Sequence, residues 1–389
     1  MKKSIFFCAA LFACAFAFQS CDKVDNPSGK PLEPTKAVID NGTELADAVK
    51  NFAKEGVLEV PSSVVELNVS ESIDLSEIEV KAENLTLLAA KGIEIKIGKP
   101  MTNVSIVGDA AEPAKIIANA GFVVSNNFAL GNVIIDASSL TGENKQLIVL
   151  NGTKEYVTRP DGTKDDSHLL IDVVDLQGVT ITGMPDGLIR DNQKTLLKNL
   201  TINNCNIKAP NKLFINFQSK GYVETVTVKN STIWSTDNAQ FFIQYGSRLK
   251  NITGAEAAGW LQTIDVQNST FYHIAYNKNV CDFPMNSQKC NVYTLKNNIL
   301  VDCGKSGQTA VGFNKGGVSA NPVWTVDGNN FVYGGENKND AEISKAGQKN
   351  GEDIVKNCVA GVPTFADAAN GDFTQSDVKT GDPSWYNAN

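Results

Sequence analysis

The sequence predicts an all-β protein, a right-handed parallel β-helix with a short N-terminal capping helix. Three observations predict this fold. Apolar residues alternate with period two, this pattern recurs at intervals of 26 to 31 residues where no insertion intervenes, and each copy has asparagine or glycine at the same position. Internal repeats of roughly 20 to 50 residues are typical of solenoids and related architectures. The clearest copies begin at Val174, Leu200, Val226, Ile264, Tyr293 and Trp324.

Each copy reads apolar, Thr or Asp, apolar, polar, and then Asn or Gly. The alternation indicates a strand with one buried face, and Asn and Gly are the residues that best tolerate left-handed backbone. We therefore expect the chain to turn a corner at Gly178, Asn204, Asn230, Asn268, Asn297 and Gly328. A second strand should begin around the apolar residue that follows three positions later, at Ile181, Ile207, Ile233, Phe271, Leu300 and Phe331. The stretch Phe128–Asn132 with Ile135 is a further copy, while Val104–Gly108 and Leu85–Ala89 are weaker ones.

The spacing of the copies favours stacked coils. Corners without an insertion between them are 26, 26, 29 and 31 residues apart, and no amphipathic helix lies between them. A βαβ unit needs about 30 or more residues, including its helix. Longer gaps predict insertions near Gly246–Trp260 and Ser138–His168, although the second can instead hold an extra coil around Leu147–Asn151.

The first residues are typical of an exported lipoprotein. Lys2 and Lys3 precede an apolar run, Ile5–Phe18, which is shorter than the roughly 20 residues of a membrane span. We expect residues 1–20 to be a signal peptide and Cys21 to be the lipidation site. Residues 21–36 contain three prolines and no apolar period, which predicts a flexible tether.

Residues 37–389 are expected to form a single β-helix domain. A solenoid needs a cover for its first coil, and Thr43 as N-cap with apolar residues at helical spacing up to Phe52 predicts such a helix. Gly56 follows it. The N-terminal cap should therefore occupy about residues 43–56, and a C-terminal cap about residues 335–389.

Charge and cysteine content limit the possible partners. The net charge of −8 argues against nucleic-acid binding, because such proteins carry basic surfaces. After the expected signal peptide, five cysteines remain besides Cys21, and the pair Cys281 and Cys290 is the candidate disulfide because these residues bracket a turn-rich loop. The alternative is buried free thiols. No CxxC motif occurs and the only histidines are His168 and His273, so no metal site is expected.

Several segments resemble known proteins. The capping helix, Gly56 and the strand Val57–Val60 resemble the opening of pectate-lyase-like β-helices. Val107–Ala110, Asn370–Phe373 and Gly381–Trp385 are similar to surface lipoproteins of polysaccharide-degrading gut-type Gram-negative bacteria. This resemblance covers nearly the whole mature chain and implies a lipid-anchored protein of the outer membrane, at the cell surface or on the periplasmic face, with glycan-import proteins as partners. Most members of that group have no assigned activity.

A polar ladder is expected on one outer face. Aligning three coils places Ile189, Ile215 and Ile243 in one inward column, so residues of the other parity should face outward. The candidate ligand-binding residues are Arg190, Asn192, Asn216, Gln218, Lys220, Gln244, Tyr245 and Arg248. Such side chains suit hydroxyl groups and uronate carboxylates. The competing interpretation is that any outward strand is polar for solubility.

The leading functional hypothesis is a surface-anchored, polysaccharide-binding lipoprotein of a glycan-utilisation system, without cofactor and with its lipid anchor as the only membrane contact. The first alternative is a polyuronide lyase acting by β-elimination, with Arg190, Lys194 or Arg248 as candidate catalytic residues and Ca²⁺ needed only in that case. The second alternative is a structural or host-contact adhesin. Hydrolysis is disfavoured because the expected carboxylate pairs are missing.

Overall fold

A computed structural model describes most of the chain after the predicted tether. The described residues are 38–141, 145–152, 157–158, 164–165, 169–217, 221–245, 261–275, 281–282, 289–304, 318–347 and 355–386. From Ile39 onward the chain forms one compact unit. Neither of the two helices described here has the length and apolar character needed to cross a membrane.

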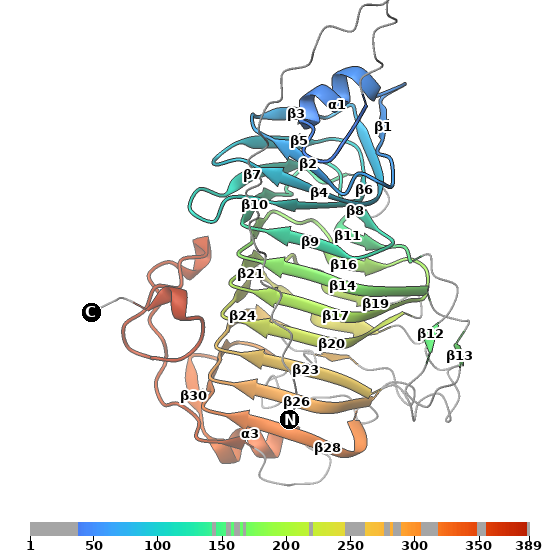
Figure 1. Cartoon of the computed structure of the whole chain (residues 1–389). Helices are drawn as coiled ribbons and strands as arrows, with labels where there is room; N and C mark the ends of the chain where they lie inside the picture. Colours follow the sequence, from blue (N-terminus) through green and yellow to red (C-terminus); the bar gives the residue numbers. More distant parts are fainter. Residues whose placement is uncertain are drawn as a thin grey trace, which may run out of the picture. The chain divides into compact units, whose positions relative to one another are not determined.

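The chain winds into a parallel β-helix, which confirms the predicted fold class (Figure 1). Its coils stack so that their strands form three lateral faces. The first face contains β1 (Val57–Glu59), the starts of β4 (Glu79–Ala89) and β6 (Met101–Val107), β8 (Phe122–Val124), β11 (Gln146–Leu150), β16 (Gly187–Asp191), β19 (Leu213–Phe217), β22 (Phe241–Tyr245) and β25 (Cys281–Asp282).

The second face carries most of the longest strands. It contains β2 (Glu66–Val69), the ends of β4 and β6, β9 (Phe128–Gly131), β14 (Leu169–Gln177), β17 (Thr195–Asn203), β20 (Tyr222–Lys229), β23 (Leu261–Gln267), β26 (Lys289–Lys296), β28 (Val318–Asp327) and β31 (Val355–Lys356). The third face contains β3 (Ile73–Leu75), β5 (Glu94–Ile97), β7 (Ala114–Ala118), β10 (Val133–Asp136), β15 (Thr180–Thr182), β18 (Asn206–Lys208), β21 (Thr232–Ala239), β24 (Thr270–Ile274), β27 (Ile299–Val301) and β29 (Asn330–Tyr333).

The core consists of apolar residues stacked in register from coil to coil. The apolar column predicted in the strand after each corner is confirmed in full and lies on the third face. Its members pair in the order Ile181, Ile207, Ile233, Phe271, Leu300 and Phe331. All six side chains are buried. Because stacked side chains bury most of their surface against the coils on either side, each coil is stable only with its neighbours in place.

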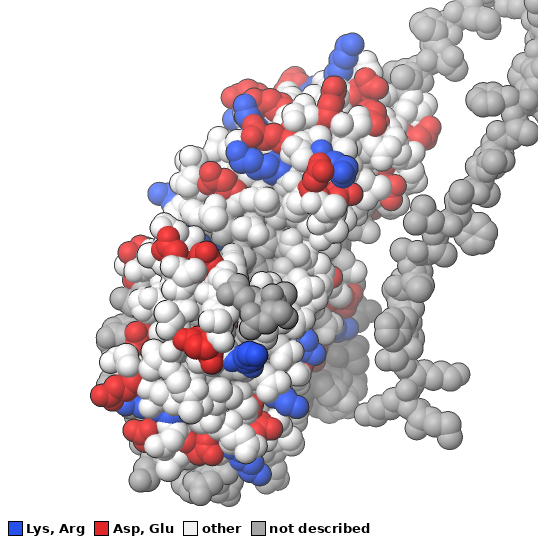
Figure 2. Space-filling view, turned by 90° about the vertical axis from the view of Figure 1, so that its left-hand side faces the viewer, with Lys and Arg blue, Asp and Glu red and all other residues white. Residues whose placement is uncertain are grey.

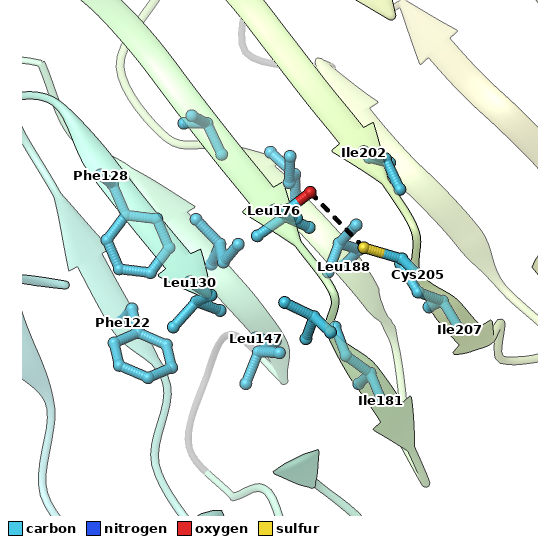
Figure 3. Close-up of a cluster of buried hydrophobic side chains, with 14 of the residues drawn as sticks. Phe122, Phe128, Leu130, Leu147, Leu176, Ile181, Leu188, Ile202, Cys205 and Ile207 are labelled. Carbon is cyan, nitrogen blue, oxygen red and sulfur yellow. Dashed lines mark hydrogen bonds between the residues drawn. The ribbon is translucent and has the colours of Figure 1, made fainter. Parts of the chain in front are cut away.

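Figure 3 shows how side chains of the three faces meet inside the helix. Leu188 of the first face, Leu176 of the second and Ile181 of the third point into one cluster. The thiol of Cys205 lies at its edge and donates a hydrogen bond to the carbonyl of Leu176 (3.5 Å). Burial raises the pKa of the Cys205 thiol to about 12, so this cysteine acts as a small apolar core residue.

The predicted corners have the left-handed backbone that the asparagine and glycine column implied. The φ angles at this column are 50° at Asn132, 64° at Gly178, 53° at Asn204, 48° at Asn230, 49° at Asn268, 55° at Asn297 and 65° at Gly328. The amides also join along the stack: Asn268 Nδ2 donates to Asn230 Oδ1 (3.4 Å) and Asn297 Nδ2 to Asn268 Oδ1 (3.3 Å). The asparagine side chains therefore link consecutive coils while their backbones make the turn.

The N-terminal capping helix is present as α1 (Leu45–Phe52) and packs against β1 and β2 of the first coil. Its apolar residues Leu45 and Ala48 are fully buried. The predicted N-cap was wrong by one residue, because Glu44 occupies that position without a side-chain cap. The Thr43 hydroxyl instead accepts a hydrogen bond from the Asp40 N–H (3.1 Å), which closes the turn before the helix.

The stretch 138–168 contains one strand of a regular coil and not an extra coil. Its strand β11 pairs with β8 and β16 on the first face, and β14 continues the same coil on the second face. Between β11 and β14 the backbone of β12 (Val157–Thr158) pairs antiparallel with β13 (Lys164–Asp165). The expected insertion at 246–260 lies outside the described residues.

The C-terminal segment covers part of the third face. After β30 (Glu336–Lys338), α3 (Asp340–Gly347) and β31, the chain runs back beside β24 and β21 (Figure 1). Gly381 N donates to Asn297 O (2.9 Å), and the Trp385 indole donates to the Thr232 hydroxyl (2.7 Å). Phe373 is fully buried there, with its ring 6.0 Å from that of Trp234. The segment expected as an end cap therefore also seals a lateral face.

Acidic and basic side chains are interspersed on the side that carries the third face, and they are densest over the N-terminal coils (Figure 2). Pairs between successive coils account for much of this pattern, as with Lys96 and Asp74 (3.6 Å) and Lys115 and Glu94 (3.4 Å). Exposed pairs of this kind contribute little to stability because water screens them. The described residues on this side form no broad patch of a single sign.

Candidate functional site

The predicted register of the ladder residues is present on the first face. Arg190 of β16 pairs with Asn216 of β19, and Asn216 pairs with Gln244 of β22. The column beside them, Ile189, Ile215 and Ile243, is fully buried and in register. The apolar column fixes the strands so that the three polar residues fall in one line along the stack.

This line continues in both directions. Val149 of β11 pairs with Arg190 and with Val123 of β8, and at the other end Gln244 pairs with Asp282 of β25. We call these six positions the first-face row: Val123, Val149, Arg190, Asn216, Gln244 and Asp282. The row joins an apolar part to a polar part across six consecutive coils.

The row is partly enclosed. Arg190 and Gln244 are half-buried, whereas the exposed fraction is 7% for Asn216 and 8% for Val149. The Arg190 guanidinium has no ion pair or hydrogen bond to any residue that the structure describes. A half-buried guanidinium without a carboxylate keeps five N–H donors for an incoming group. Arg190 is therefore the strongest binding group of the row.

Asp191 shapes the turn that follows Arg190, and its structural role was not anticipated from the sequence. Its carboxylate is 1% exposed and accepts from the N–H groups of Gln193 (3.0 Å) and Thr195 (2.9 Å). A third bond comes from Gly221 N in the next coil (2.8 Å). Burial raises the pKa of Asp191, while these N–H donors oppose the rise. The aspartate thus fixes the end of β16 and joins it to the following coil.

Two further ladder candidates lie on this turn. Asn192 and Lys194 are both exposed, and Lys194 has a left-handed φ of 52°. The turn therefore presents an amide and an ammonium group to solvent within four residues of Arg190. Of the other candidates, Gln218, Lys220 and Arg248 lie outside the described residues, as does the side chain of Tyr245.

His273 and Cys303 lie away from the ladder candidates. His273 Nε2 lies 3.5 Å from Asp302 Oδ2, the imidazole stacks on Tyr272, and burial lowers the pKa of His273. Cys303 is buried, and burial raises the pKa of its thiol to about 12. These groups belong to the third face and its corner, away from the first-face row. The side chains of the disulfide candidates Cys281 and Cys290, and all of His168, lie outside the described part.

The described residues contain no group of three or more His, Cys, Asp and Glu side chains that could hold a metal ion. The chemistry that the first-face row offers is hydrogen bonding from the Arg190 guanidinium, which lies in register with the amide side chains of Asn216 and Gln244 and beside two valines. Such a surface can bind a flexible polymer with many hydroxyl or carboxylate groups.

The comparison with known families adds one finding. A family model described as a domain of unknown function (DUF4957) matches residues 93–236, just over a third of the chain. The match runs from β5 to β21 and includes Arg190, Asn192 and Asn216. No curated protein matches the chain. The family and the parallel strands fit a β-helix-like fold, and neither assigns an activity.

Proposed function

We propose that this chain is a polysaccharide-binding protein that holds an extended glycan along the first-face row. The observation that carries the proposal is the register of Arg190, Asn216 and Gln244, with the guanidinium of Arg190 unpaired within the described structure. A charge-assisted hydrogen bond from such a group contributes about 1.5–3 kcal/mol, more than an exposed neutral contact.

The spacing of the row suits a linear polymer. Neighbouring strands lie about 4.8 Å apart, which is close to the length of one sugar ring in an extended chain. Six positions in register thus span about 24 Å, enough for about five rings. The partly exposed Val123 can contact the C–H face of a ring, while the Arg190 guanidinium binds hydroxyl or carboxylate groups.

We further propose that the protein is exported and lipid-anchored at Cys21, at the outer-membrane surface of a polysaccharide-degrading bacterium. The signal-like residues 1–20, the proline-containing tether and the likeness to pectate-lyase-like surface lipoproteins support this location. In this setting the protein would hold glycan for import proteins in the same membrane. Labelling with a radioactive fatty acid that is lost in a Cys21→Ser variant tests the anchor.

Binding can be tested with the purified full-length chain on a panel of plant and host glycans. We expect Arg190→Ala to weaken binding of the recognised glycan by about 10- to 100-fold, because 1.5–3 kcal/mol are lost. Gln240→Ala is the matched control, since that exposed amide lies at the opposite corner, between β21 and β22. Absence of binding to every glycan, or equal binding by Arg190→Ala, would contradict the proposal.

A polyuronide lyase is the second candidate, and one observation favours it. Arg190 and Lys194 flank a single turn, which places a guanidinium and an exposed amine within four residues. These groups could neutralise a uronate carboxylate and remove its α-proton. Incubation with pectate or alginate, with and without calcium, should then produce an unsaturated-uronate absorbance that Lys194→Ala abolishes. A glycan that binds without this absorbance leaves binding alone as the function.

A further inference from the structure

A hollow of about 180 Å³ lies at the corner between the first and second faces, near the N-terminal end of the first-face row. Three coils contribute to its walls. The lining residues are Asn84, Asn126, Asn127, Leu170, Ile171 and Asp172. We call it the asparagine hollow.

A narrow coil between two wider ones accounts for the asparagine hollow. In β6 only Asn103, with a φ of 54°, separates Thr102 of the first face from Val104 of the second. Asn103 holds both neighbouring coils, since its Nδ2 donates to Ala82 O (3.1 Å) and its Oδ1 accepts from Ser125 N (2.6 Å). The coils on either side take longer paths around the corner and extend beyond it.

The walls are fixed by a bond that passes over the narrow coil. Asn126 Nδ2 donates to the carbonyl of Glu83, 43 residues earlier in the chain (2.9 Å). The other two amides are free: Asn84 and Asn127 are exposed and have no hydrogen bond to any described residue. The structure thus holds two exposed amide groups at the rim of a recess whose walls are joined by this hydrogen bond.

The charge balance of the asparagine hollow does not favour binding of a cation. Asp172 is the one carboxylate of the lining, and its Oδ1 lies 3.2 Å from Nζ of Lys198. Because this lysine balances the carboxylate, the asparagine hollow has almost no net charge. Each free amide offers a donor and an acceptor together, which matches neighbouring hydroxyl groups, while Leu170 supplies an apolar wall.

Size restricts the ligand to one small ring. Pockets for drug-sized ligands enclose about 300–1,000 Å³, so 180 Å³ is too small for an oligosaccharide. We propose that the asparagine hollow binds a single uncharged sugar unit, as a branch or terminal residue of the glycan on the first-face row. This inference rests on the proposed function and names a second binding region for it.

The two regions are adjacent along the chain and in space. Asn126 follows Val123 of the row by three residues. Leu169, next to Leu170, donates its N–H to the carbonyl of Lys194 in the following coil (3.2 Å). A chain bound along the row therefore passes beside the asparagine hollow, where a side branch can enter.

The test uses the full-length chain and free neutral monosaccharides, glucose, galactose, mannose and N-acetylglucosamine, observed by saturation-transfer NMR. We expect transfer to at least one sugar, its loss in the Asn84→Ala/Asn127→Ala double variant, and its retention in the control variant Gln240→Ala. The double variant should also bind a branched glycan about tenfold more weakly, since two neutral hydrogen bonds are lost. Both asparagines are exposed, so an unchanged melting temperature should show that the variant is folded.

Each outcome separates the two proposals. Transfer to no sugar, or equal transfer in the double variant, overturns the asparagine hollow as a sugar site even if the chain binds polysaccharide through Arg190. The opposite result is also possible: saturation transfer to a monosaccharide depends on Asn84 and Asn127, but Arg190→Ala binds polysaccharide as well as the parent chain does. That result overturns the first-face row as a glycan site.

Discussion

The Oδ2 atom of Asp191 accepts a 2.8 Å hydrogen bond from the N–H of Gly221, thirty residues later in the chain. This bond joins the turn after Arg190 to the start of the next coil on the second face. A Cβ atom at Gly221 would lie 2.5 Å from the same carboxylate oxygen and 2.5 Å from the carbonyl of Thr195. The contact therefore requires an aspartate at one position and a glycine at the other.

We expect Asp191→Ala to lower the free energy of unfolding by about 3 kcal/mol, because it leaves buried N–H groups without an acceptor. Urea unfolding followed by circular dichroism measures this change. The matched control is Asp74→Ala, where an exposed carboxylate accepts from Ser76 N (2.9 Å) in a similar turn. Water replaces that acceptor, so the control should lose much less. Equal losses in both variants would contradict the assigned role of Asp191.

The corner asparagines should tolerate glycine better than other residues. Asn230 has a φ of 48°, and its side chain bonds to Asn203 Oδ1 (3.3 Å) and accepts from Asn268 (3.4 Å). Glycine and alanine both lose these bonds, but only alanine adds strain of about 1–2 kcal/mol in left-handed backbone. Urea unfolding should therefore rank wild type above Asn230→Gly and Asn230→Gly above Asn230→Ala. A higher stability for the alanine variant would be inconsistent with the corner geometry.

The aromatic contacts of the C-terminal segment should stabilise the fold. Phe373 is fully buried, and its ring lies 5.0 Å from that of Phe365 and 5.6 Å from that of Tyr272. Phe373→Ala should cost about 3–5 kcal/mol through lost burial and a cavity, measured by urea unfolding. Phe373→Leu, which fills part of the space, should cost less. A loss below about 1 kcal/mol for alanine would mean that the segment packs loosely on the third face.

Docking of the same segment should depend on pH through Asp382. Its Oδ2 accepts from the Thr232 hydroxyl (2.8 Å), and burial raises the pKa of Asp382 above its ordinary value. The folded state therefore binds the proton more tightly than the unfolded state. The stability that this group contributes is fully present below the unfolded pKa and is lost as pH rises through the folded pKa.

The side chain at position 382 cannot ionise in an Asp382→Asn variant, so the stability of this variant does not fall as pH rises through the pKa of Asp382. We expect the melting temperature of the wild type to fall relative to the variant as pH rises from about 3 to 7. The nearby Tyr386, whose pKa is raised to about 12, stays neutral over that interval. A constant difference between the two melting curves across the interval would contradict the raised pKa.

The parts of the fold that depend on local pattern could be read from the sequence. The corner column at Asn204, Asn230 and Asn268 and the apolar column at Ile207, Ile233 and Phe271 repeat at almost fixed spacing, because every coil meets the same geometric demands. The register of Arg190, Asn216 and Gln244 followed from the adjacent isoleucines for the same reason.

Features that depend on contacts between distant segments carried no such signal. Nothing local marks Thr232 and Thr270 as buried, because the cover comes from Asp382 and Trp385 more than a hundred residues later. The roles of Asp191 and of the asparagine hollow likewise depend on neighbouring coils. An acidic residue at the last position of a first-face strand, as at Asp191, is the signal that could have revealed the turn.

The most direct test of glycan binding by this β-helix is a crystal structure of the full-length chain with the oligosaccharide it binds most tightly. We expect sugar density along the first-face row, with ring oxygens or hydroxyls within hydrogen-bond distance of the Arg190 guanidinium. Density confined to the second or third face, or a first face that stays bare at saturating ligand, would contradict it.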